Sequence, residues 1–154
     1  MKIVYLHGLE SPQGGPKVDF LNQLGETLAP SMDYKKPNLF AETLRQVKTF
    51  NPDLIIGSSM GGYFAKALAS HTGTDALLFN PAIHSRSMEP TGVSYGSKRF
   101  KATVVLGEKD DIIEPHRTWV MLNKERGNYS IKMTKGMAHR TPENIFKKWV
   151  LDLT

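Results

Sequence analysis

DLIIGSSMG, residues 53–61, joins a short apolar run to a segment of helical pattern through a serine framed by glycines. A continuous apolar run of this length is typical of a strand that is covered on both faces. Gly57 and Gly61 stand two residues before and two residues after Ser59, where larger side chains would obstruct a tight turn. The stretch therefore predicts a buried strand, a sharp turn that projects Ser59, and a helix that begins at Met60.

Short apolar runs alternate with amphipathic segments in both directions from this stretch. Strands are predicted over Lys2–His7, Asp53–Ser58, Asp75–Asn80, Ala102–Gly107 and Tyr129–Thr134, with a short edge strand over Met32–Lys36. Helices are predicted over Pro16–Ala29, Phe40–Phe50, Met60–His71, Pro115–Arg126 and Pro142–Leu151, the last with Thr141 as its N-cap. Strands that alternate with helices predict the α/β class: a three-layer α/β/α sandwich around a mostly parallel sheet.

Length and composition restrict the possible functions. The 154 residues suggest one domain over 1–154, and 40% apolar with 23% charged residues is ordinary globular composition. With no cysteine, the chain has no disulfide and no thiol nucleophile. We expect a cytoplasmic protein without a membrane partner, because the sequence has no signal-peptide pattern and no apolar run of membrane length. The net charge of +5 is scattered rather than interleaved with aromatic residues, so we expect no nucleic-acid partner.

Three residues capable of acyl-transfer chemistry follow predicted strands. Ser59, an acid at Asp110 or Asp111, and His139 occur in the chain order found in α/β-hydrolases. The carboxyl ends of parallel strands meet at one edge of a sheet, where ligands bind. There a histidine activates the serine hydroxyl, and a carboxylate orients the histidine. Asp110 fits the acid position better, and Asp111 remains the alternative.

The backbone N–H groups of Leu9 and Met60 are the predicted oxyanion donors, because both follow strands and Met60 opens a helix. A second G-x-S-x-G pattern surrounds Ser94, but no strand precedes it, so we interpret it as a loop. His7 is expected to hold the first loop in shape. The acidic and histidine residues near 110–116 match no known ligand spacing, so we expect no metal and no cofactor.

Several motifs together resemble the small bacterial YqiA-like esterases, a branch of the α/β-hydrolase superfamily. They are YLHGLESP (Tyr5–Pro12), Lys17, IGSSMGGYFA (Ile56–Ala65) and FNPA (Phe79–Ala82). The resemblance implies a serine esterase with Ser59, Asp110 and His139 as its triad and Leu9 and Met60 as oxyanion donors. Only 27 residues separate Ala82 from Asp110, which is short for this family and leaves no room for a cap domain.

The sequence therefore predicts a minimal α/β-hydrolase that cleaves small carboxylic esters through an acyl-enzyme, as a monomer or small homo-oligomer. Two alternatives remain open: a thioesterase that acts on an acidic carrier such as coenzyme A, and a binding protein with the same fold but no turnover. We expect the substrate pocket to be shallow. Its predicted lining residues are Glu10, Ser11, Tyr63, Ile83, His84 and Met88.

Overall fold

Six parallel strands form one sheet in the order β2-β1-β3-β4-β5-β6 in a computed structural model that describes residues 1–9 and 11–154. The strands are β1 (Lys2–Leu6), β2 (Glu26–Leu28), β3 (Leu54–Ser58), β4 (Ala76–Phe79), β5 (Lys101–Gly107) and β6 (Asn128–Thr134). The helices are α1 (Pro16–Leu24), α2 (Leu39–Phe50), α3 (Met60–Thr72), α4 (Pro115–Lys124) and α5 (Glu143–Leu153). The five long predicted strands and all five predicted helices are present, and apart from the end of the first helix their bounds shift by at most two residues.

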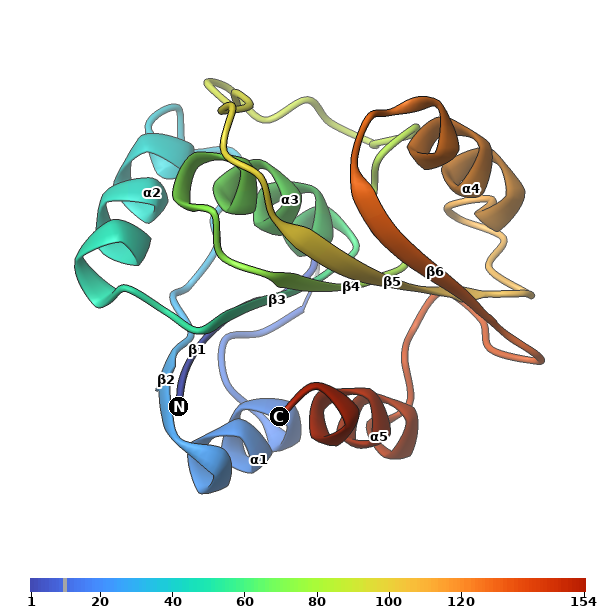
Figure 1. Cartoon of the computed structure of the whole chain (residues 1–154), viewed down its shortest axis with the longest axis horizontal. Helices are drawn as coiled ribbons and strands as arrows, with labels where there is room; N and C mark the ends of the chain where they lie inside the picture. Colours follow the sequence, from blue (N-terminus) through green and yellow to red (C-terminus); the bar gives the residue numbers. More distant parts are fainter. Residues whose placement is uncertain (10) are drawn as a thin grey trace.

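Helices cover both faces of the sheet (Figure 1). Helices α2, α3 and α4 lie on one face, and α1 and α5 lie on the other. Alternate residues of each strand point to opposite faces of the sheet, and each face has its own hydrophobic core. Val4 packs into the core beneath α2 and α3, and Ile3 packs with Phe146 of α5 in the other core. This two-sided burial explains the continuous apolar runs of the strands. The predicted three-layer α/β/α class is confirmed.

The edge strand lies elsewhere than predicted. Helix α1 ends at Leu24, and β2 follows at once and pairs with β1, so the predicted helix over 16–29 is too long. A side chain at Gly25 would collide with the carbonyl group of Met1, and the N–H of Glu26 donates to that carbonyl oxygen at 3.0 Å. The predicted strand over Met32–Lys36 is wrong: its buried side chains belong to an irregular segment packed on the core.

The last helix, α5, begins one residue later and ends two residues later than predicted. Pro142 occupies the N-cap position of α5, so Thr141 is not the cap. Among the described residues, no helix combines the length and apolar character that crossing a bilayer requires.

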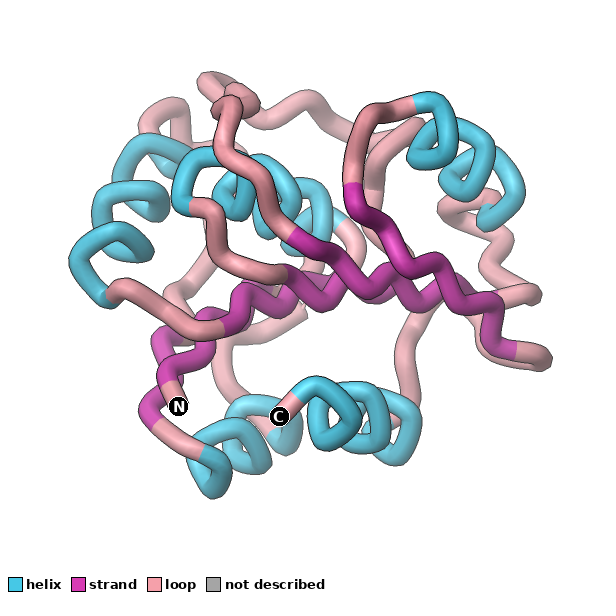
Figure 2. The backbone as a smooth tube through the Cα atoms, viewed as in Figure 1, coloured by secondary structure: helices cyan, strands magenta, loops and turns pink. Residues whose placement is uncertain are grey.

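The connection from β4 to β5, residues 80–100, contains neither helix nor strand (Figure 2). Hydrogen bonds to Ser70 tie it to α3: Gly96 N–H donates to the hydroxyl oxygen at 2.8 Å, and Lys98 N–H donates to the carbonyl oxygen at 2.9 Å. In the described part of the chain no cap domain covers the sheet edge, as expected for a minimal hydrolase fold.

Candidate active site

Successive strands are added to the sheet in opposite directions on the two sides of the β1–β3 pair. The chain runs from β1 to β2 on one side, and later from β3 to β4 on the other side. Connections that leave two neighbouring parallel strands in opposite directions open a crevice at their carboxyl ends, where ligands bind in open α/β sheets. Gly8, after β1, and Ser59, after β3, meet in this crevice: a side chain at Gly8 would lie 3.5 Å from the Ser59 Cβ atom.

Ser59 occupies a sharp turn between β3 and α3. Its backbone angles, φ 55° and ψ −117°, put a non-glycine residue at positive φ, which costs about 1–3 kcal/mol. A side chain at Gly57 would collide with the carbonyl group of Gly61, and one at Gly61 would collide with that of Leu6. The two glycines thus allow strand and helix to approach closely, and the strained turn lifts the serine hydroxyl out of the sheet edge.

The structure brings Ser59, His139 and Asp110 into one hydrogen-bonded chain. Ser59 Oγ lies 2.9 Å from His139 Nε2, and His139 Nδ1 lies 2.8 Å from Asp110 Oδ2. A carboxylate only accepts, so Nδ1 carries the proton and Nε2 is left as an acceptor for the serine hydroxyl. This arrangement can remove a proton from Ser59 and stabilise the imidazolium that forms.

The buried acid beside the histidine is Asp110 rather than Asp111. The Asp110 side chain is 0% exposed, and its Oδ1 atom accepts N–H groups of Ile112 and Ile113, each at 2.9 Å. These two bonds fix the carboxylate with Oδ2 directed at His139. Asp111 is exposed, and within the described residues it makes no hydrogen bond to the histidine. The two alternatives from the sequence therefore occupy different environments.

Two backbone donors lie beside Ser59, at Leu9 and Met60. Met60 is the first residue of α3, so its N–H has no acceptor within the helix. Both residues line the same cavity as Ser59, and neither N–H has a hydrogen-bond acceptor among the described residues. Free N–H groups at such a position can bind the negative oxygen of a tetrahedral intermediate.

His7 and Asn80 hold the loops that carry these groups. The Nε2 atom of His7 accepts the Met32 N–H at 3.0 Å, and its Nδ1 atom donates to the Gly8 carbonyl at 2.8 Å, so His7 shapes the first loop as expected. The Asn80 amide donates to the carbonyl of His139 at 2.8 Å, and its oxygen accepts the Gly107 N–H at 2.7 Å.

Asn80 also donates to the Ala138 carbonyl at 3.1 Å. It has a positive φ of 41° and is 1% exposed. Sequence reasoning missed this role, although a buried asparagine that directly follows an apolar strand was a usable signal.

Replacing Asn80 with alanine should lower both stability and activity. The change leaves the Gly107 N–H and two carbonyl groups of the histidine loop without partners, which costs about 1–3 kcal/mol. The loosened loop should also lower kcat of any reaction that uses His139. Chemical denaturation and steady-state kinetics measure the two effects. Asn51→Ala is the matched control, because Asn51 also has positive φ but caps the distant end of α2, so it should leave kcat unchanged.

A cavity of about 620 Å³ opens above the Ser59 hydroxyl. Its wall includes Ser11, one of the expected lining residues. It also includes residues that were not among those expected there: Tyr5, Lys17, Ser85, Arg86, Ser87, Ile112, Ile113, Arg140 and Thr141. Burial raises the pKa of the Tyr5 hydroxyl, which keeps it neutral. A pocket of this volume suits a small ligand.

Four of the six predicted lining residues do not line this cavity. Tyr63 packs beneath the Arg86 guanidinium at 4.1 Å, and His84 donates to the Glu114 carbonyl at 3.0 Å. Ile83 is buried and Met88 packs on the core. Glu10 lies outside the described residues. The prediction failed here because the connection after β4 is irregular, so no periodicity indicates which side chains face inward.

The second G-x-S-x-G serine, Ser94, lies in the irregular connection as expected. His71 Nε2 is 3.1 Å from its hydroxyl but also 2.9 Å from its carbonyl oxygen. A carbonyl oxygen only accepts, so this nitrogen carries a proton and cannot act as a base toward Ser94. Ser94 therefore lacks the arrangement that surrounds Ser59.

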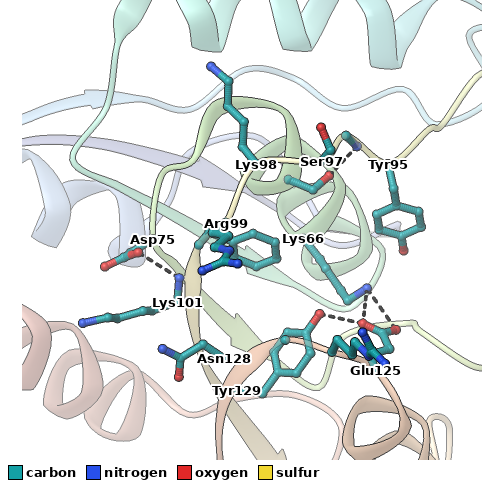
Figure 3. A pocket seen from close by; sticks show the side chains of 15 residues that line it. Lys66, Asp75, Tyr95, Ser97, Lys98, Arg99, Lys101, Glu125, Asn128 and Tyr129 are labelled. Carbon is teal, nitrogen blue, oxygen red and sulfur yellow. Dashed lines mark hydrogen bonds and ion pairs between the residues drawn. The ribbon is translucent and has the colours of Figure 1, made fainter.

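A larger cavity, about 1110 Å³, lies at the other end of the strands, where β4, β5 and β6 begin (Figure 3). Its buried ammonium group, on Lys66, already contacts the Glu125 carboxylate at 3.1 Å and the Tyr95 ring at 4.3 Å. Tyr129 donates to the same carboxylate, and Lys98 points away from the pair (Figure 3). No histidine lines this larger cavity in the described part of the chain, so we place the candidate active site at Ser59. Within residues 1–9 and 11–154, no group of metal-ligating side chains is present.

Comparisons with known proteins agree on the fold. A protein from Xanthomonas campestris pv. campestris assigned to the α/β-superfamily hydrolases superposes with a TM-score of 0.70, 15% identity and 98% coverage of both chains. A monoacylglycerol lipase from Paleococcus ferrophilus gives 0.71, 13% identity and coverage of 99% of this chain and 93% of that one. A lidless α/β serine hydrolase from Xanthomonas campestris gives 0.57, 15% identity, and 98% and 77% coverage.

Similarity at these identities establishes the α/β-hydrolase fold alone. No curated protein matches the chain in sequence. The model of the Uncharacterised protein family (UPF0227) matches residues 2–145, nearly the whole chain. The chain therefore belongs to UPF0227, the YqiA-like family that its motifs resemble.

Proposed function

We propose that the protein is a serine hydrolase that cleaves small carboxylic esters through an acyl-enzyme. The observation that carries this proposal is the hydrogen-bonded chain from Ser59 Oγ through His139 to the buried Asp110, with bonds of 2.9 and 2.8 Å. A monoacylglycerol lipase and a lidless serine hydrolase are among the proteins that share the fold, which supports the same assignment.

The geometry supports a two-step mechanism. Ser59 Oγ attacks the ester carbonyl carbon while His139 Nε2 takes its proton, and the N–H groups of Leu9 and Met60 bind the oxyanion. His139 then returns the proton to the leaving alcohol, which departs and leaves the acyl group on Ser59. Water, deprotonated by the same nitrogen, then attacks the acyl-enzyme carbonyl carbon. The bond from that carbon to Ser59 Oγ breaks, Ser59 recovers its proton from His139, and the carboxylic acid is released. Asp110 remains ionised throughout and stabilises the imidazolium.

A fluorophosphonate probe tests this proposal without knowledge of the natural substrate. We expect one covalent adduct, which intact mass and peptide mapping locate at Ser59. The internal control is Ser94, which has the same local motif but no base, and it should remain unlabelled. Folded protein that gives no adduct, or an adduct on Ser94, would contradict the proposal. The first of these outcomes would favour a ligand-binding protein with the hydrolase fold.

Esters and thioesters react through analogous tetrahedral intermediates and give the same acyl-enzyme, so the Ser59 geometry serves both. A panel of matched oxygen esters and acyl-coenzyme A substrates therefore follows labelling. We expect oxygen esters to be cleaved with the higher kcat/KM, because the cavity of about 620 Å³ is small for a long carrier.

A further inference from the structure

The wall of the candidate active site is positively charged. Three cationic side chains line the cavity with Ser59: Lys17, Arg86 and Arg140. No carboxylate belongs to this wall in the part of the chain that the structure describes. The chain as a whole has 20 basic and 15 acidic residues, whereas the charged side chains described on this wall are all basic.

The Arg86 guanidinium already binds acceptors within the protein. Its Nε atom donates to the Glu89 carboxylate at 3.0 Å, and its Nη1 atom donates to the carbonyl oxygens of Ala82 and Ile83 at 2.9 and 2.8 Å. The guanidinium also stacks on the Tyr63 ring at 4.1 Å. Arg86 therefore stabilises the loop after β4, and these bonds already occupy its Nε and Nη1 donors.

Lys17 and Arg140 differ from Arg86. Among the described residues, neither forms an ion pair or a side-chain hydrogen bond. Lys17 is partly buried, with its ammonium 5.3 Å from the centre of the Phe146 ring. Glu143, the nearby acid, is instead paired with Lys147 at 3.7 Å.

These surroundings disfavour the charged form of Lys17. Burial lowers the pKa of its ammonium group, and the positive charge of Arg140 lowers it further, while Glu143 acts in the opposite direction. Both cations line the cavity, Lys17 partly buried and Arg140 exposed, and the positive charge of Arg140 disfavours that of Lys17. An anion bound between the two side chains would offset this repulsion. Lys17 and Arg140 thus line the same cavity as the proposed nucleophile, Ser59.

We propose that Lys17 and Arg140 form an anion-binding subsite beside Ser59, so that the preferred substrate is an ester that carries a carboxylate or phosphate group. This inference rests on the proposed function, because it names the substrate class of the same site. The cavity volume suits a small molecule with the anion a few bonds from the ester carbonyl. The anion belongs either to the acyl part or to the alcohol part of that ester.

Two pairs of esters, each with an anionic and a neutral member, show which part of the substrate carries the anion. The mono-para-nitrophenyl ester of adipic acid is compared with para-nitrophenyl hexanoate, and para-acetoxybenzoate with para-acetoxybenzamide. We expect the anionic member of one pair to have a kcat/KM about ten- to hundredfold higher, the value of a charge-assisted hydrogen bond. The pair that shows the preference identifies the part of the substrate that carries the anion. Added salt should reduce the preference.

Variants assign the preference to the subsite. Lys17→Met keeps the aliphatic stem, and Arg140→Gln keeps a polar side chain. Each should lower the anionic-to-neutral ratio of kcat/KM about tenfold or more, mainly through KM. Lys148→Met is the matched control, because Lys148 is an exposed lysine of α5 paired with Asp152, and it should leave the ratio unchanged.

Binding of adipate to the Ser59→Ala protein, measured by calorimetry, separates this inference from the proposed function. Adipate binding that Lys17→Met abolishes supports the subsite even if no ester is cleaved. Serine-dependent cleavage with no anionic preference in either pair and no adipate binding would overturn the subsite and leave the hydrolase standing. A preference that persists in both variants would also overturn it.

Discussion

Ser59→Ala is expected to lower kcat/KM for ester hydrolysis about 10⁵- to 10⁶-fold, because it removes the atom that forms the acyl-enzyme. Loss of the hydroxyl also ends the 2.9 Å bond to His139 Nε2. The free energy of unfolding should change little, because alanine retains the Cβ atom and the strained backbone at φ 55°. Kinetics with a good aryl ester and thermal melting measure the two quantities.

Ser94→Ala supplies the comparison for this result. It removes a serine from the same G-x-S-x-G pattern, and the hydroxyl it removes lies beside a histidine nitrogen that carries a proton. Its kinetics should match those of the unmodified protein. Equal activity in Ser59→Ala, or a large loss in Ser94→Ala, would overturn the assignment of the nucleophile.

Asp110→Asn should lower kcat on the order of 10³- to 10⁴-fold with little change in KM. The amide oxygen can still accept the N–H groups of Ile112 and Ile113, so the loop should keep its shape. The amide nitrogen would then donate to His139 Nδ1, which forces the ring proton onto Nε2. In that tautomer the histidine cannot take the proton of Ser59.

Asp111→Asn tests the neighbouring acid with the same chemical change. Asp111 is exposed, so its substitution should alter kcat less than about twofold, as is usual for a surface site away from the chemistry. The rate of fluorophosphonate labelling should follow the same order, slow in Asp110→Asn and normal in Asp111→Asn. The reverse order would assign the orienting acid to Asp111.

The sheet and the central residues of the site could be predicted because local sequence determines them. Buried parallel strands need continuous apolar runs such as Leu54–Ser58. The turn at Ser59 needs glycines that let β3 and α3 approach closely. Parallel strands also bring the residues after them to one end of the sheet, so strand ends alone indicated that His139 and one acid of the pair Asp110 and Asp111 would lie near Ser59.

Features that depend on tertiary contacts escaped prediction. Strand β2 has three residues, and its pairing partner β1 defines it better than its own composition does. The cavity wall comes from loops without periodicity, so neither the place of Tyr63 behind it nor that of Arg140 on it has a sequence signal. Asn80 bonds residues 58 and 59 positions away in the chain, and no local pattern reports contacts at that distance.

The parallel order of the strands has a consequence for biosynthesis. Every strand pairs with a partner on the far side of a crossover, and the histidine that contacts Ser59 lies 80 positions after it. A chain emerging from the ribosome can therefore form the turn around Ser59 long before residue 139 exists, and β6 must then join the sheet edge to bring His139 into place. Under the proposed mechanism, the growing polypeptide would hold the nucleophile without its base until β6 docks, so it would cleave no ester before the fold is nearly complete.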